Sequence, residues 1–254
     1  MEYPYVKVIV SGDVIELYTA KKPVIIPPKK SKPDDEDLPE SPTEDRTDER
    51  RQQTVRDARN MTRRLALMNF ESGDKFLTLT FDPKKFTEDE LRDITFTDKL
   101  FKTFMQRFNY RVGEKLKYIA VREFHKSGRI HYHMICNWKV ELQFENQVRE
   151  FERYLGEKVW KHGFVDIKQL NHVDNVGAYI IKYMTKNVAI EFFKDKKIYL
   201  CSKGLERPYE YSGVEAMALI NAYDLEQKKE VFTNSYESEY LGTIEYKEFN
   251  LKRI

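Results

Sequence analysis

The stretch that most constrains the fold is a single hairpin at residues 118–136, YIAVREFHKSGRIHYHMIC. Two runs rich in β-branched and aromatic residues flank a Lys-Ser-Gly sequence, a pattern typical of paired strands. A three-residue hairpin loop ends on a residue in the left-handed backbone region, which Gly128 adopts at no steric cost. The pattern therefore predicts two antiparallel strands joined by residues 126–128.

This loop fixes which side chains share a face of the hairpin. It places Glu123 opposite His131, and His133 follows two residues later on the same strand. Opposed residues share a face, as do residues two apart, so the three side chains converge. Two imidazoles and a carboxylate leave room for water or substrate oxygens and suit a divalent ion such as Mg²⁺ or Mn²⁺. His125 lies on the same face and could support these ligands or replace one of them.

The hairpin pattern is also compatible with two alternatives to such a site. A His-x-His sequence can be an accident of an alternating strand, although a carboxylate in the matching register weakens that interpretation. The same donors could hold Fe²⁺ in an oxygenase, so the hairpin alone does not specify a reaction. The opposite face is apolar and is expected to pack against helices through Phe124, Ile130, Tyr132 and Met134.

Hydrophobic periodicity around the hairpin predicts a β-α-β-β-α-β-α order. Split βαβ units of this kind form an antiparallel sheet with helices on one face, which leaves the other face open for a site or for nucleic acid. We therefore expect an α+β fold with about five strands, an N-terminal hairpin and a C-terminal extension. The expected strands are residues 76–81, 117–124, 130–136 and 163–170, and the expected helices are residues 97–111, 143–161 and 175–188.

The flanking segments suggest how the chain divides. Residues 5–18, YVKVIVSGDVIELY, predict a hairpin around Ser-Gly-Asp. The last part of the chain is mixed in composition, and only a helix near residues 213–228 is predicted there. We expect an N-terminal hairpin at residues 1–28, an acidic disordered linker at 29–50, a main domain at 51–190 and a C-terminal extension at 191–254.

Charge is distributed unevenly along the chain. Residues 34–50 hold nine acidic and two basic side chains, a balance of −7, so the remainder carries +9 within a net charge of +2. The acidic segment is typical of disorder and the basic body favours a polyanionic partner, although a well-solvated surface fits equally well. Residues 50–69 predict a basic helix that either contacts phosphate, with Arg63 and Arg64 as candidates, or presents a solvated face.

Composition argues against membrane and disulfide-rich proteins. The hydrophobic fraction is 41%, and no apolar run approaches the roughly 20 residues that cross a bilayer. The N-terminus lacks the residue order of a signal peptide, so we expect a cytoplasmic protein with no membrane partner. Cys136 and Cys201 lack CxxC spacing and the numbers of a disulfide framework, and we expect reduced thiols.

A second informative segment, residues 174–187 (DNVGAYIIKYMTKN), predicts a helix that presents phenols beside cations. Tyr179, Lys182, Tyr183 and Lys186 occupy positions i, i+3, i+4 and i+7 and therefore share one stripe. A phenol titrates near pH ~10, so attack on phosphate at neutral pH needs a neighbouring cation or a metal. An ordinary amphipathic helix would show a similar pattern. Here, however, a separate apolar face is available for burial: Ile180, Ile181 and Met184.

Three motifs in this order resemble those of the HUH rolling-circle replication initiators. They are TLTF at 78–81, IHYH at 130–133 and AYIIKYMTK at 178–186, and the resemblance spans most of residues 76–187. The first motif is weakly specific, the second moderately so and the third fairly specific. Their order and spacing together resemble bacterial plasmid and phage members of the family.

The resemblance implies that residues 51–190 form a metal-dependent endonuclease and strand transferase that starts rolling-circle replication. Such enzymes nick and rejoin single-stranded origin DNA through a 5′-phosphotyrosine intermediate. The chain lacks a GxxxxGK[ST] phosphate loop, so a host helicase and polymerase are the expected partners. The implied catalytic residues are Tyr183 as first choice of nucleophile, Tyr179, Lys182 and Lys186; the ligands of Mg²⁺ or Mn²⁺ are His131, His133 and Glu123; the DNA contacts we expect are Thr78, Thr80, Arg63, Arg64 and Arg129.

The sequence leaves two alternative functions open. A conjugative relaxase or single-strand transposase of the same superfamily would keep the chemistry, but relaxases usually show a three-histidine cluster and transposases a different tyrosine helix. A non-catalytic, RRM-like module would instead bind nucleic acid through exposed aromatic residues on its central strands, without converging metal ligands.

Overall fold

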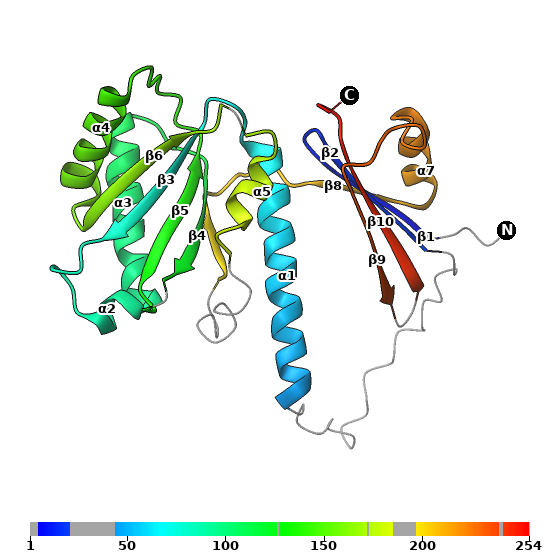
Figure 1. Cartoon of the computed structure of the whole chain (residues 1–254), viewed down its shortest axis with the longest axis horizontal. Helices are drawn as coiled ribbons and strands as arrows, with labels where there is room; N and C mark the ends of the chain where they lie inside the picture. Colours follow the sequence, from blue (N-terminus) through cyan, green and yellow to red (C-terminus); the bar gives the residue numbers. More distant parts are fainter. Residues whose placement is uncertain are drawn as a thin grey trace. The chain divides into compact units, whose positions relative to one another are not determined.

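Two five-stranded antiparallel sheets organise the chain in the computed structural model, which describes residues 5–20, 44–125, 127–171, 173–184, 197–238 and 241–253 (Figure 1). The contacts divide the chain into two units. The larger unit is Glu44–Glu206, and the smaller unit combines Met1–Thr43 with Arg207–Ile254. This arrangement confirms the predicted α+β class.

The sheet of the larger unit carries the predicted hairpin near its centre. Its strands follow the order β6-β3-β5-β4-β7, and all neighbours are antiparallel. Four of them match the expected strands, whereas the short β7 falls in the part of the chain that the sequence left unassigned. The bounds are β3 Lys75–Phe81, β4 Tyr118–Phe124, β5 Ile130–Cys136, β6 Gly163–Gln169 and β7 Tyr199–Cys201.

One face of this sheet packs against α3 (Ile94–Val112), α4 (Glu145–Tyr154) and the π-helix η1 (Leu155–Trp160) (Figure 1). The predicted apolar face of the hairpin is confirmed, since all four of its expected residues lie in this core. A buried polar link ties α3 to the sheet. Arg122 donates to both carboxylate oxygens of Asp98, and the hydroxyl of Tyr132 donates to the same carboxylate at 2.7 Å.

The second face is not fully open, in contrast to our expectation. The helices α1 (Glu44–Asn69) and α5 (Val176–Ile181) pack on it. The strands supply buried apolar side chains to that contact, which explains why helices cover this part of the face. These strand residues are Phe76, Ile119, Val121 and Ile135.

The long helix α1 begins earlier than expected. Its first residue is Glu44, inside the segment assigned to the acidic linker at 29–50. The rest of that linker up to residue 43 lies outside the described residues. No helix within the described ranges is long and apolar enough to cross a membrane.

The smaller unit joins the two ends of the chain in one sheet. The predicted hairpin is present as β1 (Tyr5–Ser11) and β2 (Val14–Ala20), which pair throughout their length. Strands from the C-terminal extension flank it in the order β8-β1-β2-β10-β9, a pairing the sequence did not predict. Their bounds are β8 Tyr209–Ser212, β9 Phe232–Ser238 and β10 Gly242–Asn250, and α7 (Gly213–Ala222) packs on this sheet near the helix expected at 213–228.

Candidate active site

The β4–β5 hairpin has the register that its loop predicted. Glu123 pairs with His131, and Val121 pairs with His133. At the loop, the amide of Gly128 donates to the carbonyl of residue 125 at 2.7 Å, and Gly128 has a φ of +82°. Lys126, the first loop residue, lies outside the described residues. The strand pairing therefore places both imidazoles and the carboxylate on one face of the sheet.

His133 is held by contacts at both of its ring nitrogens. Its Nε2 lies 2.6 Å from Oε2 of Glu123, and its Nδ1 lies 3.2 Å from the hydroxyl of Thr78. The residue is only 5% exposed. Burial lowers the pKa of His133 below its usual value, although the hydrogen bond and charge of Glu123 act in the opposite direction.

His131 occupies the outer position on the same strand. The hydroxyl of Thr80 lies 3.4 Å from its Nδ1, and the ring of His125 is stacked beside it at a centroid distance of 6.0 Å. Burial lowers the pKa of His131 and so favours the neutral ring. Thr78 and Thr80, which the sequence suggested as DNA contacts, thus touch one nitrogen of each histidine in this structure. These contacts can fix the tautomer and orientation of the two rings.

The donor set fits a divalent ion in chemical type but not yet in arrangement. Among the described residues, no group of three or more His, Cys, Asp or Glu side chains is placed so that it could hold a metal ion. The reason is local, because Glu123 Oε2 and His133 Nε2, two atoms that would bind the ion, bond to each other. The Glu123 side chain is 36% exposed, so a rotation can separate the two donors. The metal ligands therefore stay a prediction.

Tyr183 lies directly against this cluster. Its ring stacks on that of His133 at a centroid distance of 3.9 Å and an interplanar angle of 22°, and it also contacts Phe76 at 5.2 Å. The side chain is half-buried. Burial, a hydrogen bond with Tyr179 and the charges of Glu123 and Asp166 raise the pKa of Tyr183 above its usual value. The phenol is therefore protonated at neutral pH in this arrangement.

Tyr179 and Lys182 complete the described part of the tyrosine stripe. The two phenol rings lie 6.1 Å apart between centroids, and the Nζ of Lys182 lies 3.7 Å from the centroid of Tyr179 and 5.1 Å from that of Tyr183. The α-helix itself ends at Ile181, and the chain continues in tighter turns to residue 184. Lys186, the second predicted cation, lies outside the described residues.

The placement of α5 depends on α1, which the sequence did not reveal. Arg59 donates to the carbonyl oxygens of Ile181, at 2.9 Å, and of Met184. A Cβ at Gly177 would lie 2.5 Å from the carbonyl oxygen of Arg63, so only glycine lets the two helices approach this closely. Arg59 and Gly177 thus position the segment that bears the phenols.

Asp166 is a further site residue that sequence reasoning missed. It pairs with Thr78 across β3 and β6, which puts it on the same face as His133. Its charge acts on Tyr183 and its carboxylate lies 3.8 Å from Nζ of Lys168. The alternation in GFVDIKQL indicates that Asp166 and Lys168 share a face, but only the pairing of β3 with β6 shows that it is the face of the site.

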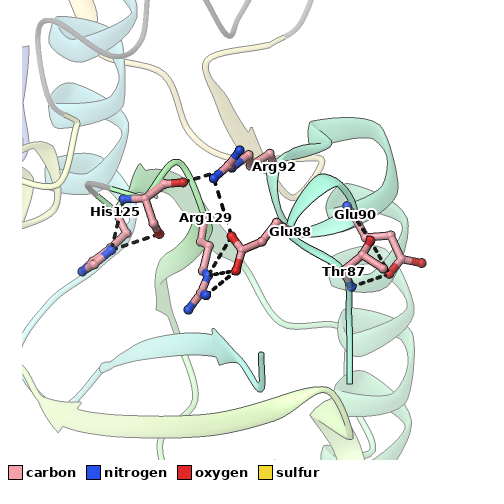
Figure 2. Close-up of polar contacts among 7 residues, drawn as sticks. Thr87, Glu88, Glu90, Arg92, His125 and Arg129 are labelled. Atoms are coloured by element: carbon pink, nitrogen blue, oxygen red, sulfur yellow. Dashed lines mark hydrogen bonds and ion pairs between the residues drawn. The ribbon is translucent and has the colours of Figure 1, made fainter. Parts of the chain in front are cut away.

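The predicted arginine contacts to DNA have other partners or are buried. Arg63 is 9% exposed and its side chain packs against Gly177 of α5, while Arg64 is half-buried on α1. Arg129 forms an ion pair with Glu88 of the short helix α2 (Glu88–Arg92), and its Nε lies 3.0 Å from that carboxylate (Figure 2). These contacts tie α2 to the hairpin. A role for any of the three arginines in DNA binding stays a prediction.

Comparison with known proteins links this part of the chain to replication. Residues 74–188 match the model of the Replication-associated protein ORF2 family. The matched segment starts beside β3, includes the hairpin and extends past α5, so it contains all three sequence motifs. Neither the search of curated proteins nor the search of solved structures found a match. The family match supports a replication-initiator role.

Proposed function

We propose that the larger unit nicks and rejoins single-stranded DNA through a 5′-phosphotyrosine and thereby starts rolling-circle replication. The observation that carries the proposal is the stacking of Tyr183 on His133, whose Nε2 contacts Glu123. A phenol and a set of potential metal ligands thus lie close enough to act on a single phosphate. The family match over residues 74–188 supports the same biological role.

The reaction proposed for Tyr183 is a transesterification. Its phenol oxygen forms a bond to phosphorus as the bond between phosphorus and the 3′ oxygen breaks, which leaves a 5′-phosphotyrosine and a 3′-hydroxyl. A divalent ion bound by His131, His133 and Glu123 would polarise the scissile phosphate as a Lewis acid. The number of phosphoester bonds is conserved, so the reverse reaction rejoins the DNA without ATP.

Proton transfer assigns roles to the charged side chains. The phenol must lose a proton that its raised pKa holds tightly, and the departing 3′ oxygen must gain one. Asp166 lies outside the ligand set and its charge reaches Tyr183, so its carboxylate is the proposed proton acceptor. Lys182, which lies over both rings, is proposed to stabilise negative charge on the phosphate.

Two phenols permit two successive strand transfers. Tyr179 lies 6.1 Å from Tyr183 between ring centroids, about the rise of one helical turn, ~5.4 Å. After the first nick, a second phenol could attack the regenerated origin while the first still holds a 5′ end. Unwinding is proposed to come from a host helicase, because the sequence lacks a GxxxxGK[ST] loop.

The structure bears on the RRM-like alternative through its aromatic residues. Such a module would expose aromatic rings on its central strands. On the central strand β3, however, Phe76 is fully buried, and the exposed Phe164 lies on the edge strand β6. The aromatic pattern therefore favours the nuclease proposal over base stacking on the central strands.

The test of the proposal is the formation of a covalent adduct on labelled single-stranded origin DNA with Mg²⁺ or Mn²⁺. We expect Tyr183→Phe to lose most adduct, Tyr179→Phe to lose the second transfer, and the double variant to form none. Tyr209→Phe, at a 56% exposed phenol of the smaller unit, serves as the matched control and should retain full activity. Adducts formed by the double variant would refute the nucleophile assignment, and a wild-type protein without any adduct would refute the nuclease proposal.

A further inference from the structure

A cluster of cations lies on the helical side of the larger unit, away from the tyrosine site. Gln106, Arg107, Tyr110 and Arg111 of α3 line an open depression of about 300 Å³ together with Lys158 and Lys161 at the end of η1. The helix α3 packs on the sheet face opposite to that of His133. This surface therefore cannot belong to the catalytic cluster.

The cations of this depression are not neutralised by neighbouring carboxylates. No carboxylate occurs among its lining residues, all of which are described, and none of the four cations forms an ion pair with another described residue. Arg107 donates instead to the backbone carbonyl of Val159 at 3.3 Å. Burial lowers the pKa of His162, and the charges of Arg107 and Lys161 lower it further. The surface thus carries a concentrated positive field.

Two further features indicate a ligand with both phosphates and rings. Tyr110 is 83% exposed, the largest exposed fraction among the large hydrophobic residues that the structure describes. Lys161 has a φ of +67°, in a region where glycine is favoured, yet the chain places a cation there. Lys161 also lines an adjoining hollow of about 560 Å³, which extends the concave surface toward β6.

We propose that this surface, formed by Arg107, Tyr110, Arg111, Lys158 and Lys161, is a second binding site for single-stranded nucleic acid. The cations would contact successive phosphates and an unpaired base would stack on Tyr110, the combination found at sites that bind single strands without sequence preference. A duplex offers no free base face to an exposed phenol, so the tyrosine favours a single strand. The site would hold DNA outside the catalytic face, and it does not depend on the nuclease activity.

Binding of labelled oligothymidylate to the full chain, measured by fluorescence anisotropy across a salt series, tests this site. The variant Arg111→Gln/Lys158→Gln/Lys161→Gln should weaken binding at least tenfold and reduce the slope of log K against log salt by about 2, since each phosphate contact contributes ~0.7. Tyr110→Ala should weaken binding about tenfold with an unchanged slope, and Tyr110→Phe should restore it. Lys228→Gln/Lys229→Gln, at exposed lysines of the smaller unit, is the control and should bind normally.

Lys161→Gly separates binding from folding. Glycine relieves the left-handed backbone, so this variant should unfold at the same or a higher urea concentration while it binds DNA more weakly. Equal affinity of the triple variant and the control would overturn the proposal. So would unchanged binding by Tyr110→Ala, or a loss confined to duplex DNA or to an acidic peptide, because either would assign the surface to another partner. A nicking assay on the same variants reports separately on the proposed nuclease.

Discussion

The β4–β5 hairpin and the α5 segment bring the two halves of the candidate site together, but they are positioned by different kinds of contact. The hairpin obtains its geometry locally, because a short loop with Gly128 in the left-handed region sets the pairing of Glu123 with His131. The α5 segment depends on α1, more than 100 residues away in sequence, through Arg59 and Gly177. The ligand geometry should therefore be robust, and the position of the phenols should be sensitive to distant substitutions.

The largest expected effect comes from removal of the hairpin donors. His131→Ala and Glu123→Ala should each reduce nicking by on the order of 100-fold or more, because each removes a proposed ligand, and added Mn²⁺ should not restore the rate. Far-UV circular dichroism should stay unchanged, since both side chains are partly exposed. Glu145→Ala, at an exposed carboxylate on α4, is the control. Full activity in both hairpin variants would remove these donors from the mechanism.

Gly177→Ala tests whether long-range packing places the phenols. The added methyl group would meet the backbone oxygen of residue 63 at 2.5 Å, and we expect a destabilisation of about 1–3 kcal/mol. Adduct formation should fall while the hairpin contacts persist. Urea unfolding and adduct yield would measure the two effects, with Ala178→Ser on the exposed side of α5 as the control. An unaltered stability would show that α5 does not need this close approach to α1.

Arg59→Gln tests the second contact between α1 and α5 and should have a smaller effect. The guanidinium donates to two carbonyl groups at the end of the tyrosine segment, and its loss should cost about 1 kcal/mol. We expect the rate of adduct formation to fall several-fold in a single-turnover assay. Arg56→Gln, one turn earlier on the exposed side of α1, should behave like the wild type. Equal rates in the two variants would contradict a positioning role for Arg59.

The smallest expected effect is a pH dependence of stability from the two site histidines. Burial lowers the pKa of His131 and of His133, so between these values and the usual one near 6.5 the unfolded chain binds more protons than the folded chain. Their contribution to stability is therefore present above pH ~6.5 and is lost as the pH falls through the folded values. Urea unfolding at pH 7.5 and pH 5.5 in EDTA should show this loss, and His131→Gln/His133→Gln should reduce it. An identical pH dependence in the double variant would contradict it.

The predictability of the site follows the same division. A loop that contains its own glycine and two alternating strands carry all the information needed for the register of Glu123 with His131. The partner of Thr78 on β6 is a contact between strands distant in sequence, and for that reason Asp166 was not identified. The burial of Arg63 was also missed, because a helix with many arginines does not show which of them faces another helix.

The fold outside the site shows the same limit. Composition and periodicity predicted the α+β class and the N-terminal hairpin, because both depend on local patterns. The pairing of β1 with β8 and of β2 with β10 joins residues near opposite ends of the chain, and no local pattern specifies it. The cover of α1 and α5 over the second sheet face likewise depends on which distant apolar surfaces meet.

The most direct measurement of the central claim is identification of the amino acid that carries the DNA. Wild-type protein would be incubated with labelled single-stranded origin DNA and Mn²⁺, digested with protease, and the DNA-linked peptide sequenced by mass spectrometry. The account predicts a linkage to Tyr183, with a fraction at Tyr179. A linkage to a residue elsewhere, or cleavage that leaves no protein on the 5′ end, would contradict it.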